Sequence, residues 1–126
     1  MYEMSGGTGS RRFMGPEVAL GEPYNLSADI YSFAILFWEL CALEKAYGKL
    51  SQEEHKRTVI QGMDRPPLKR EWRPEICSIL ENCWKRNPRE RMNAKDLYKQ
   101  LKEQVNIYYD DGFEECEEGY ERKLCI

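Results

Sequence analysis

The chain has 126 residues, of which 41% are apolar, so it can form one small domain or part of a larger one. Its 19 basic and 22 acidic residues give a formal net charge of -3, which excludes the basic surface expected of a nucleic-acid-binding domain. The five cysteines include no CxxC pair and His55 is the only histidine, so we expect no metal site. Three of the cysteines (Cys41, Cys77 and Cys83) fall in apolar helical patterns, which is typical of reduced thiols in a cytoplasmic protein.

The first predicted elements lead to one dominant helix. Residues 1–12 are rich in Gly and Ser and have no hydrophobic period, which indicates a loop and not a signal peptide. Pro16 and Glu17 favour a short helix, because proline fits the first turn and the helix dipole stabilises an acidic side chain there. Residues 27–43 form the longest apolar run, and apolar side chains occur on every face of a helix drawn through them. We therefore expect a helix that is buried all round.

Polar residues mark the start of this central helix. Ser27 is expected to cap it, with Asp29 in the first turn, where the helix dipole stabilises a negative charge. Asp29 and Glu39 interrupt the apolar run, which is also short for a bilayer span. A membrane is therefore not an expected partner.

Two amphipathic helices are predicted downstream of the central one. Ser51 and Glu54 have the spacing of a capping box, which starts an exposed helix over residues 51–61. A second helix is predicted over residues 74–85, because Pro74 can occupy its first turn. Its apolar stripe has helical spacing and consists of Ile76, Ile79, Leu80, Cys83 and Trp84.

The last predicted helix covers residues 94–108, and Asn93 is expected to cap it. From Tyr109 the sequence is dense in carboxylates, so residues 109–126 are expected to form an acidic, disordered tail. The whole pattern predicts a mainly α fold with no convincing strand.

Three sequence motifs follow one another along the chain. They are Thr8-Gly9-Ser10-Arg11-Arg12-Phe13-Met14-Gly15-Pro16-Glu17, then Ser27-Ala28-Asp29-Ile30-Tyr31-Ser32-Phe33-Ala34-Ile35-Leu36-Phe37-Trp38-Glu39-Leu40, then Cys83-Trp84 followed by Asn87-Pro88 and Arg91. In this order and spacing they resemble the lower half of the C-terminal lobe of a eukaryotic protein kinase, and they are most similar to the tyrosine-kinase-like group of serine/threonine kinases. The resemblance implies that residues 1–108 are a fragment of a kinase domain, a partial helical lobe without the N-lobe sheet.

The resemblance also implies roles for individual residues. Glu17 stands in the family's Ala-Pro-Glu motif, whose Glu forms a buried ion pair with an Arg that corresponds to Arg91. Asp29 matches the aspartate that hydrogen-bonds the backbone of the catalytic loop. Without the resemblance, Glu17 and Arg91 would be unrelated surface charges and Asp29 an ordinary first-turn acid. The structural motif residues that it implies are Gly15, Pro16, Glu17, Asp29, Trp84 and Arg91.

Ser10 matches the Ser or Thr of the loop that shapes the family's substrate pocket, and the alternative is an ordinary Ser in a flexible loop. Ser5, Thr8 and Ser10 are also possible phosphorylation sites, because Arg11 and Arg12 are adjacent basic partners for a phosphate. The resemblance of the run from Ser10 to Arg12 implies Ser/Thr rather than Tyr as the residue that the family member would phosphorylate.

The groups that the family uses for catalysis are missing from the sequence. It has no glycine-rich nucleotide loop, no lysine on a preceding strand, no H-R-D catalytic loop and no D-F-G triplet. ATP and magnesium are held by those groups in the intact family. We therefore expect this chain to bind no cofactor, to contain no catalytic residue and to be inactive alone.

The resulting functional expectation has two forms. In the first, the intact protein transfers the γ-phosphate of ATP to protein Ser or Thr, and this chain supplies the substrate loop and the helical lobe. Its partners would then be the missing upstream kinase segments and a protein substrate or regulator at helix 51–61, which resembles the family's G helix. The alternative is a complete, non-catalytic helical binding module derived from a kinase lobe.

Overall fold

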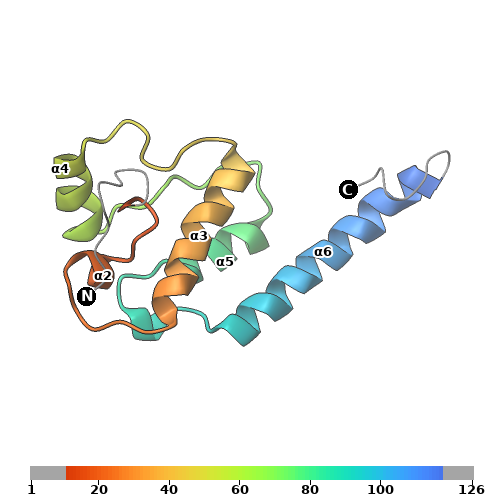
Figure 1. The fold of residues 1–126 in the computed structure, drawn as a ribbon. Coiled ribbons are helices and arrows are strands. Elements are labelled where there is room, and N and C mark those ends of the chain that lie inside the picture. The colour runs from red at the N-terminus through yellow and green to blue at the C-terminus, as the bar shows by residue number, and fades with distance from the viewer. Residues whose placement is uncertain (1–10, 118–126) are drawn as a thin grey trace. The chain divides into compact units, whose positions relative to one another are not determined.

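The computed structural model describes the backbone of residues 11–117 and the side chains of residues 11–107 (Figure 1). The described residues form helices joined by loops, and no strand occurs among them, so the predicted mainly α fold is confirmed. The chain divides between Asn93 and Ala94 into two compact units.

The first unit is built on α3 (Ser27–Ala42), the helix predicted from the long apolar run. A short helix, α2 (Pro16–Ala19), precedes it and begins at proline as expected. The predicted cap of α3 is wrong, because Ser27 is its first helical residue. The Oδ1 atom of Asn25 accepts hydrogen bonds from the Ser27 backbone N–H at 2.9 Å and from its Oγ at 2.7 Å. Asn25 therefore satisfies the donor that Ser27 leaves open at the helix start.

The central helix is buried on one face and not all round. Tyr31 and Ile35 have no exposed surface, whereas Leu36 is 46% exposed and Leu40 is 65% exposed. Phe33 and Phe37 lie between these extremes and stack on each other with 5.7 Å between ring centroids. The expectation of complete burial is therefore corrected. Complete burial is expected because α3 has no polar face, but an apolar face can also be exposed to solvent.

The predicted helix over residues 51–61 has two parts. The first is α4 (Gln52–His55), and the second is one turn of π-helix, η1 (Lys56–Ile60). The capping box is confirmed, because Ser51 Oγ accepts the Glu54 backbone N–H at 3.1 Å and Glu54 Oε1 accepts the Ser51 N–H at 3.0 Å.

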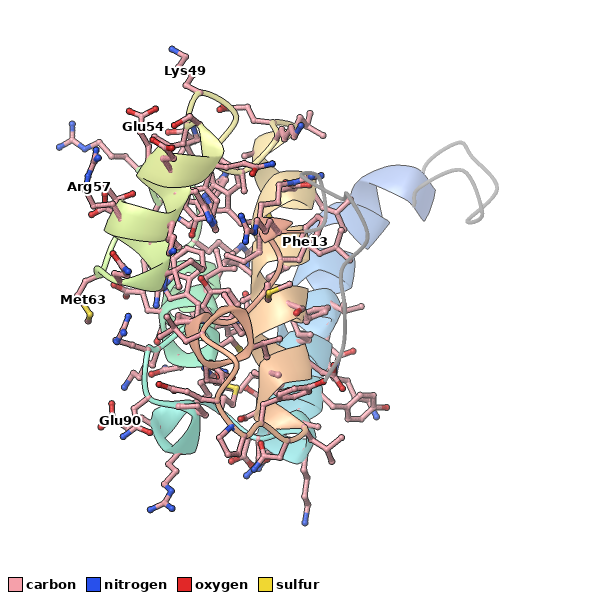
Figure 2. The ribbon with its side chains drawn as sticks, turned by 60° about the vertical axis from the view of Figure 1, so that its left-hand side comes forward. Phe13, Lys49, Glu54, Arg57, Met63 and Glu90 are labelled. Carbon is pink, nitrogen blue, oxygen red and sulfur yellow. The ribbon has the colours of Figure 1, made fainter. Side chains whose placement is uncertain are left out.

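One face of the α4–η1 pair is exposed and the other is buried. Glu54 and Arg57 point outward from it (Figure 2). Val59 and Ile60 are buried, so the expectation of an exposed helix holds for the outer face alone. The helix ends before Gly62, where a Cβ atom would lie only 2.4 Å from the Thr58 carbonyl oxygen. Glycine is therefore required at that position.

The core of the first unit joins α3 to α5 (Pro74–Cys83) and to η2, a short 3-10 helix (Pro88–Glu90). Between η1 and α5 the chain is extended and packs along α3. The Trp38 indole N–H donates to the Pro67 carbonyl at 2.7 Å, and the Trp72 ring meets the Trp38 ring edge-on with 6.3 Å between centroids.

The second unit contains α6 (Ala94–Glu117). This helix runs past the end predicted at Tyr108 and includes the first part of the acidic segment. The predicted end is wrong because glutamate is a good helix former and an existing helix extends at little cost. The rest of the expected tail, residues 118–126, lies outside the described residues. Within the described part of the chain, no helix is both long and apolar enough to span a bilayer.

Candidate functional site

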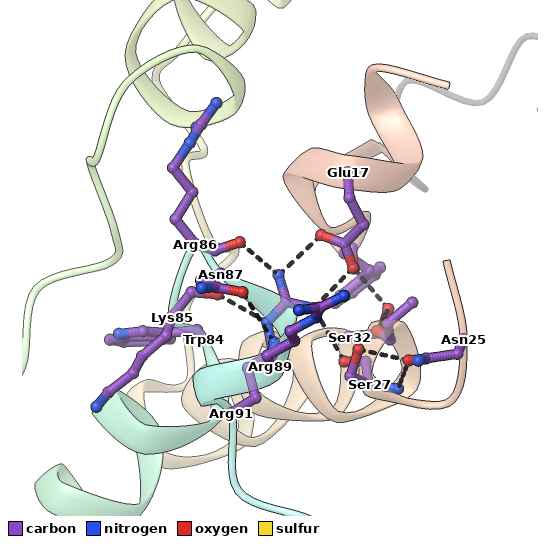
Figure 3. A network of polar contacts seen from close by, with 12 residues as sticks. Glu17, Asn25, Ser27, Ser32, Trp84, Lys85, Arg86, Asn87, Arg89 and Arg91 are labelled. Atoms are coloured by element: carbon purple, nitrogen blue, oxygen red, sulfur yellow. Dashed lines mark hydrogen bonds and ion pairs between the residues drawn. The ribbon is translucent and has the colours of Figure 1, made fainter. Parts of the chain in front are cut away.

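A buried arginine connects three segments of the first unit (Figure 3). The Arg91 guanidinium donates to Glu17 Oε2 at 2.7 Å and to Glu17 Oε1 at 2.8 Å, which is the bidentate geometry of a strong ion pair. It also donates to the backbone carbonyls of Ser27 at 3.0 Å, Lys85 at 2.7 Å and Arg86 at 3.3 Å. An arginine has five N–H donors, so every donor of Arg91 has a partner.

Burial makes this ion pair important for the fold. The Arg91 side chain has no exposed surface and the Glu17 side chain is 4% exposed. The Tyr31 ring lies 5.0 Å from the guanidinium carbon of Arg91 and contributes a cation–π contact. Burial raises the pKa of the Tyr31 hydroxyl, although the positive charges of Arg65 and Arg91 oppose the shift. The ion pair expected between Glu17 and Arg91 is thus present, with its charges screened very little by solvent.

Gly15 leaves space for the Glu17 carboxylate. A Cβ atom at Gly15 would lie 2.9 Å from Glu17 Oε1. Alanine, which the family motif has at this position, would require that oxygen to move. Glycine therefore suits the position of the carboxylate opposite Arg91.

Two further contacts hold residues 11–14 against α3. The Ser32 hydroxyl donates to the Phe13 carbonyl at 2.6 Å. About two turns further along α3, Glu39 accepts the Arg12 Nε–H at 2.6 Å and the Ala46 backbone N–H at 2.7 Å. Glu39 is partly buried, which alone would raise its pKa. The hydrogen bonds from Arg12 and Ala46 outweigh that effect and lower the pKa below its ordinary value.

Glu39 is a connection that the sequence reasoning missed. Its carboxylate joins the segment before α2 to the loop after α3. The available sequence signal is an acidic residue inside an apolar helix, which the apolar pattern alone treats as an interruption of the run. A charge in such a position is seldom present without a partner.

The structure brings some of the predicted residues together and leaves others apart. Pro16 and Glu17 begin α2, and the Glu17 carboxylate contacts Arg91. Trp84 has a different partner, because its backbone carbonyl accepts the Arg65 Nε–H at 2.8 Å. Asp29 is exposed, and its carboxylate accepts no hydrogen bond from the described residues. Ser5, Thr8 and Ser10 lie outside the described residues.

The described side chains contain no cluster of the residues that usually hold a metal ion. Among the side chains that the structure describes, no group of three His, Cys, Asp or Glu residues could hold a metal ion. Magnesium needs carboxylate oxygens in a defined geometry. The described residues therefore offer no preformed three-residue site for such an ion.

The sequence is similar to known protein kinases. Residues 1–101 match the family described as protein tyrosine and serine/threonine kinase. The chain is 34% identical over 108 residues to serine/threonine-protein kinase STY17 from Arabidopsis thaliana, covering 86% of this chain and 19% of that protein. It is 32% identical over 113 residues to dual specificity protein kinase shkD from Dictyostelium discoideum, covering 82% and 14%, respectively.

A third relative extends the same pattern. The identity to serine/threonine-protein kinase CTR1 from Arabidopsis thaliana is 34% over 83 residues, covering 66% of this chain and 10% of that protein. The chain thus spans less than a fifth of the length of each of these three relatives. Since the family match covers most of its residues, the chain belongs to the protein tyrosine and serine/threonine kinase family.

Proposed function

We propose that this chain is the C-terminal part of a kinase domain that transfers the γ-phosphate of ATP to Ser or Thr residues of proteins. The names of the relatives STY17 and CTR1 support this choice, since both are serine/threonine kinases. In this proposal residues 1–108 are the kinase part, and residues 109–126 lie beyond it. The chain contributes the substrate loop and the helical lobe on which that loop rests.

The observation that carries the proposal is the anchoring of residues 11–19 on α3. The Glu17–Arg91 ion pair holds one end of this segment, and the Arg12–Glu39 ion pair holds the other. Between them Ser32 donates to the Phe13 carbonyl. A segment fixed at three points is a suitable support for a loop that must position a substrate within a fraction of an ångström.

The substrate-positioning role falls on Ser10, which directly precedes this anchored segment. We place the docking of a protein substrate or regulator on the outer face of α4 and η1, where Glu54 and Arg57 point outward. Asp29 is proposed to bond the backbone of a catalytic loop, which agrees with its exposed carboxylate.

ATP and magnesium would be held by parts of the kinase domain other than the described residues, which offer no metal-binding cluster. Because the H-R-D and D-F-G motifs are missing from the sequence, we expect residues 1–126 alone to transfer no phosphate. The described cysteines Cys41, Cys77 and Cys83 are free thiols, which favours the reducing cytoplasm as the place of action.

A chimeric kinase tests this proposal. Residues 1–108 would replace the matching segment of STY17, and phosphate transfer from ATP to a protein substrate would be measured. We expect activity within about tenfold of the parent kinase, because a folded and correctly anchored substrate loop restores most of the transition-state geometry. Ser10→Ala should raise KM for the protein substrate and leave KM for ATP unchanged.

The control for the chimera is its stability. A chimera that unfolds cooperatively like the parent but transfers no phosphate would refute the kinase proposal. It would favour the alternative of a non-catalytic binding module. The substitution Glu71→Gln, at an exposed loop residue, should leave transfer unchanged.

A further inference from the structure

Two free thiols lie on helices that pack against each other. Cys41 is in the last turn of α3 and Cys77 is near the start of α5, and these two helices are in contact. Both cysteines are partly exposed, whereas Cys83 is buried. A partly exposed cysteine can meet a small oxidant from solution, whereas a thiol buried among apolar groups is protected.

Contacts at both ends of this helix pair show that α5 runs opposite to α3. Trp84, at the end of α5, accepts the Arg65 Nε–H with its carbonyl, and the Arg65 guanidinium carbon lies 5.2 Å from the ring centroid of Tyr31, in the first half of α3. At the other end, the ring of Trp72, just before α5, meets the ring of Trp38, in the second half of α3. The start of α5 therefore lies beside the last turns of α3.

The helix rise places the two thiols at similar heights along the pair. At about 1.5 Å per residue, Cys41 lies about 15 Å beyond Tyr31 on α3, and Cys77 lies about 10 Å before Trp84 on α5. Burial raises the pKa of Cys41, and a negative charge on Cys77 raises it further. A charge shifts a pKa in this way when the two groups are close. The helix geometry and the charge effect therefore agree that the two thiols are neighbours.

We propose that Cys41 and Cys77 form a reversible disulfide bond when the chain meets a peroxide. The bond would join the end of α3 to the start of α5, whereas Arg91 holds the opposite end of α3 through the Ser27 carbonyl. A disulfide needs its two Cβ atoms about 4 Å apart, a separation that neighbouring positions on two packed helices can supply. The proposal rests on these two thiols and does not require that the chain takes part in catalysis.

The reaction with hydrogen peroxide has two steps. The Cys77 thiolate attacks one peroxide oxygen, the O–O bond breaks, and Cys77 becomes a sulfenic acid while the released hydroxide takes up the Cys77 proton as water. The Cys41 sulfur then attacks the Cys77 sulfur, and the hydroxyl group leaves as a second water with the Cys41 proton. Two thiols thus lose two electrons, and one peroxide is reduced to two waters. Cys41 has the second role, because its raised pKa leaves little reactive thiolate near neutral pH.

Oxidation of the full chain with hydrogen peroxide near neutral pH tests the proposal. Remaining thiols are blocked, the chain is digested, and mass spectrometry with fragmentation identifies each linked pair of cysteines. We expect one dominant linkage, Cys41 to Cys77, with the loss of two hydrogens and reversal by dithiothreitol. The control is the same oxidation in urea above the unfolding midpoint, where the five cysteines should pair without this preference. The same mixture of linkages with and without urea would overturn the proposal.

Single substitutions test the role of each thiol. Cys41→Ser should leave the sulfenic acid on Cys77 unresolved, so that dimedone labels Cys77 several-fold more than in the original chain. Cys77→Ser should abolish both the linkage and this label. Cys116→Ser and Cys125→Ser remove thiols outside the described side chains, so the yield of the linkage should not change. An equal loss of the linkage in these two controls and in Cys77→Ser would contradict the proposed pairing.

The oxidised chain should also resist urea better. The bond closes the loop from Cys41 to Cys77 and restricts the unfolded chain, so the urea midpoint should rise by about 1–2 M and return after dithiothreitol. Cys41→Ser should show no such rise. Met63 is 71% exposed, and its conversion to the sulfoxide reports that oxidant has reached the chain. If Met63 is oxidised while Cys41 and Cys77 are recovered as free thiols, the proposal is wrong.

Discussion

Removal of the Glu17 charge tests whether the buried ion pair holds the first unit together. In Glu17→Gln the side chain keeps its shape, but Arg91 loses its counter-charge and faces an amide. Three backbone carbonyls and the one amide oxygen remain as acceptors for the five N–H donors of Arg91, and the amide NH2 is itself a donor. Loss of one partner of a buried ion pair costs about 3–5 kcal/mol, because the remaining charge is no longer compensated.

Urea unfolding measures this cost. The fluorescence of Trp38, Trp72 and Trp84 reports on the first unit, which contains all three tryptophans. With a typical slope of about 2 kcal/mol per M urea, a loss of about 4 kcal/mol lowers the midpoint by about 2 M. The exposed residue Glu71 provides the control, and Glu71→Gln should move the midpoint by less than about 0.3 M.

A double substitution tests whether the uncompensated charge causes the loss of stability. In Glu17→Leu/Arg91→Met both charges are absent, so no charge is left uncompensated. The double variant should be more stable than Arg91→Met alone, which leaves the Glu17 carboxylate buried without its partner. If Glu17→Gln unfolds at the same urea concentration as Glu71→Gln, the ion pair does not hold the unit and the reasoning fails.

Three further predictions use other contacts. Ser51→Ala should lower the free energy of unfolding by about 1 kcal/mol, because the capping box is lost. Ser51→Thr should retain most of that stability, and urea unfolding measures both variants. Burial raises the pKa of the Cys83 thiol to about 11, so the unfolded thiol ionises first, and stability should fall as the pH rises from 9 to 11. Cys83→Ala should show a smaller fall in urea midpoint over that range. The pKa of His55 lies below its usual 6.5, so its stabilising contribution is complete above pH 6.5 and is lost as the pH falls. The midpoint should therefore drop less in His55→Gln than in the original chain between pH 7.5 and 5.

The helices could be predicted from local patterns in the sequence. The apolar run gave α3 almost to the residue, and the stripe that includes Ile79, Leu80 and Cys83 gave α5. The capping box at Ser51 is a contact between residues three positions apart, so its side-chain bonds could also be predicted. These features depend on residues that are close in sequence.

The contacts of the candidate site depend on residues far apart in sequence. Glu17 and Arg91 are separated by 74 positions, and no local pattern joins them. They could be paired in advance only through the resemblance to the kinase family. The partner of Glu39 could not be predicted, because no local sequence pattern connects it to Arg12, which lies 27 positions earlier in the chain.

The exposed face of α3 marks the limit of hydrophobic patterns. A period of 3.6 residues identifies a buried face only when the opposite face is polar. Leu36 and Leu40 are as apolar as Ile35, so the sequence cannot indicate which of them faces solvent. Burial of α3 was for this reason predicted too broadly.

The polar contacts have a consequence for how residues 11–19 are held. Only Pro16 and Glu17 among the helical residues of α2 are buried, so little apolar surface attaches this segment to the core. Its position is instead set by directional bonds with Arg91, Ser32 and Glu39. Apolar packing tolerates small shifts, whereas a bidentate ion pair fixes both distance and orientation. The segment is therefore held by specific geometry, which a loop that positions a substrate requires.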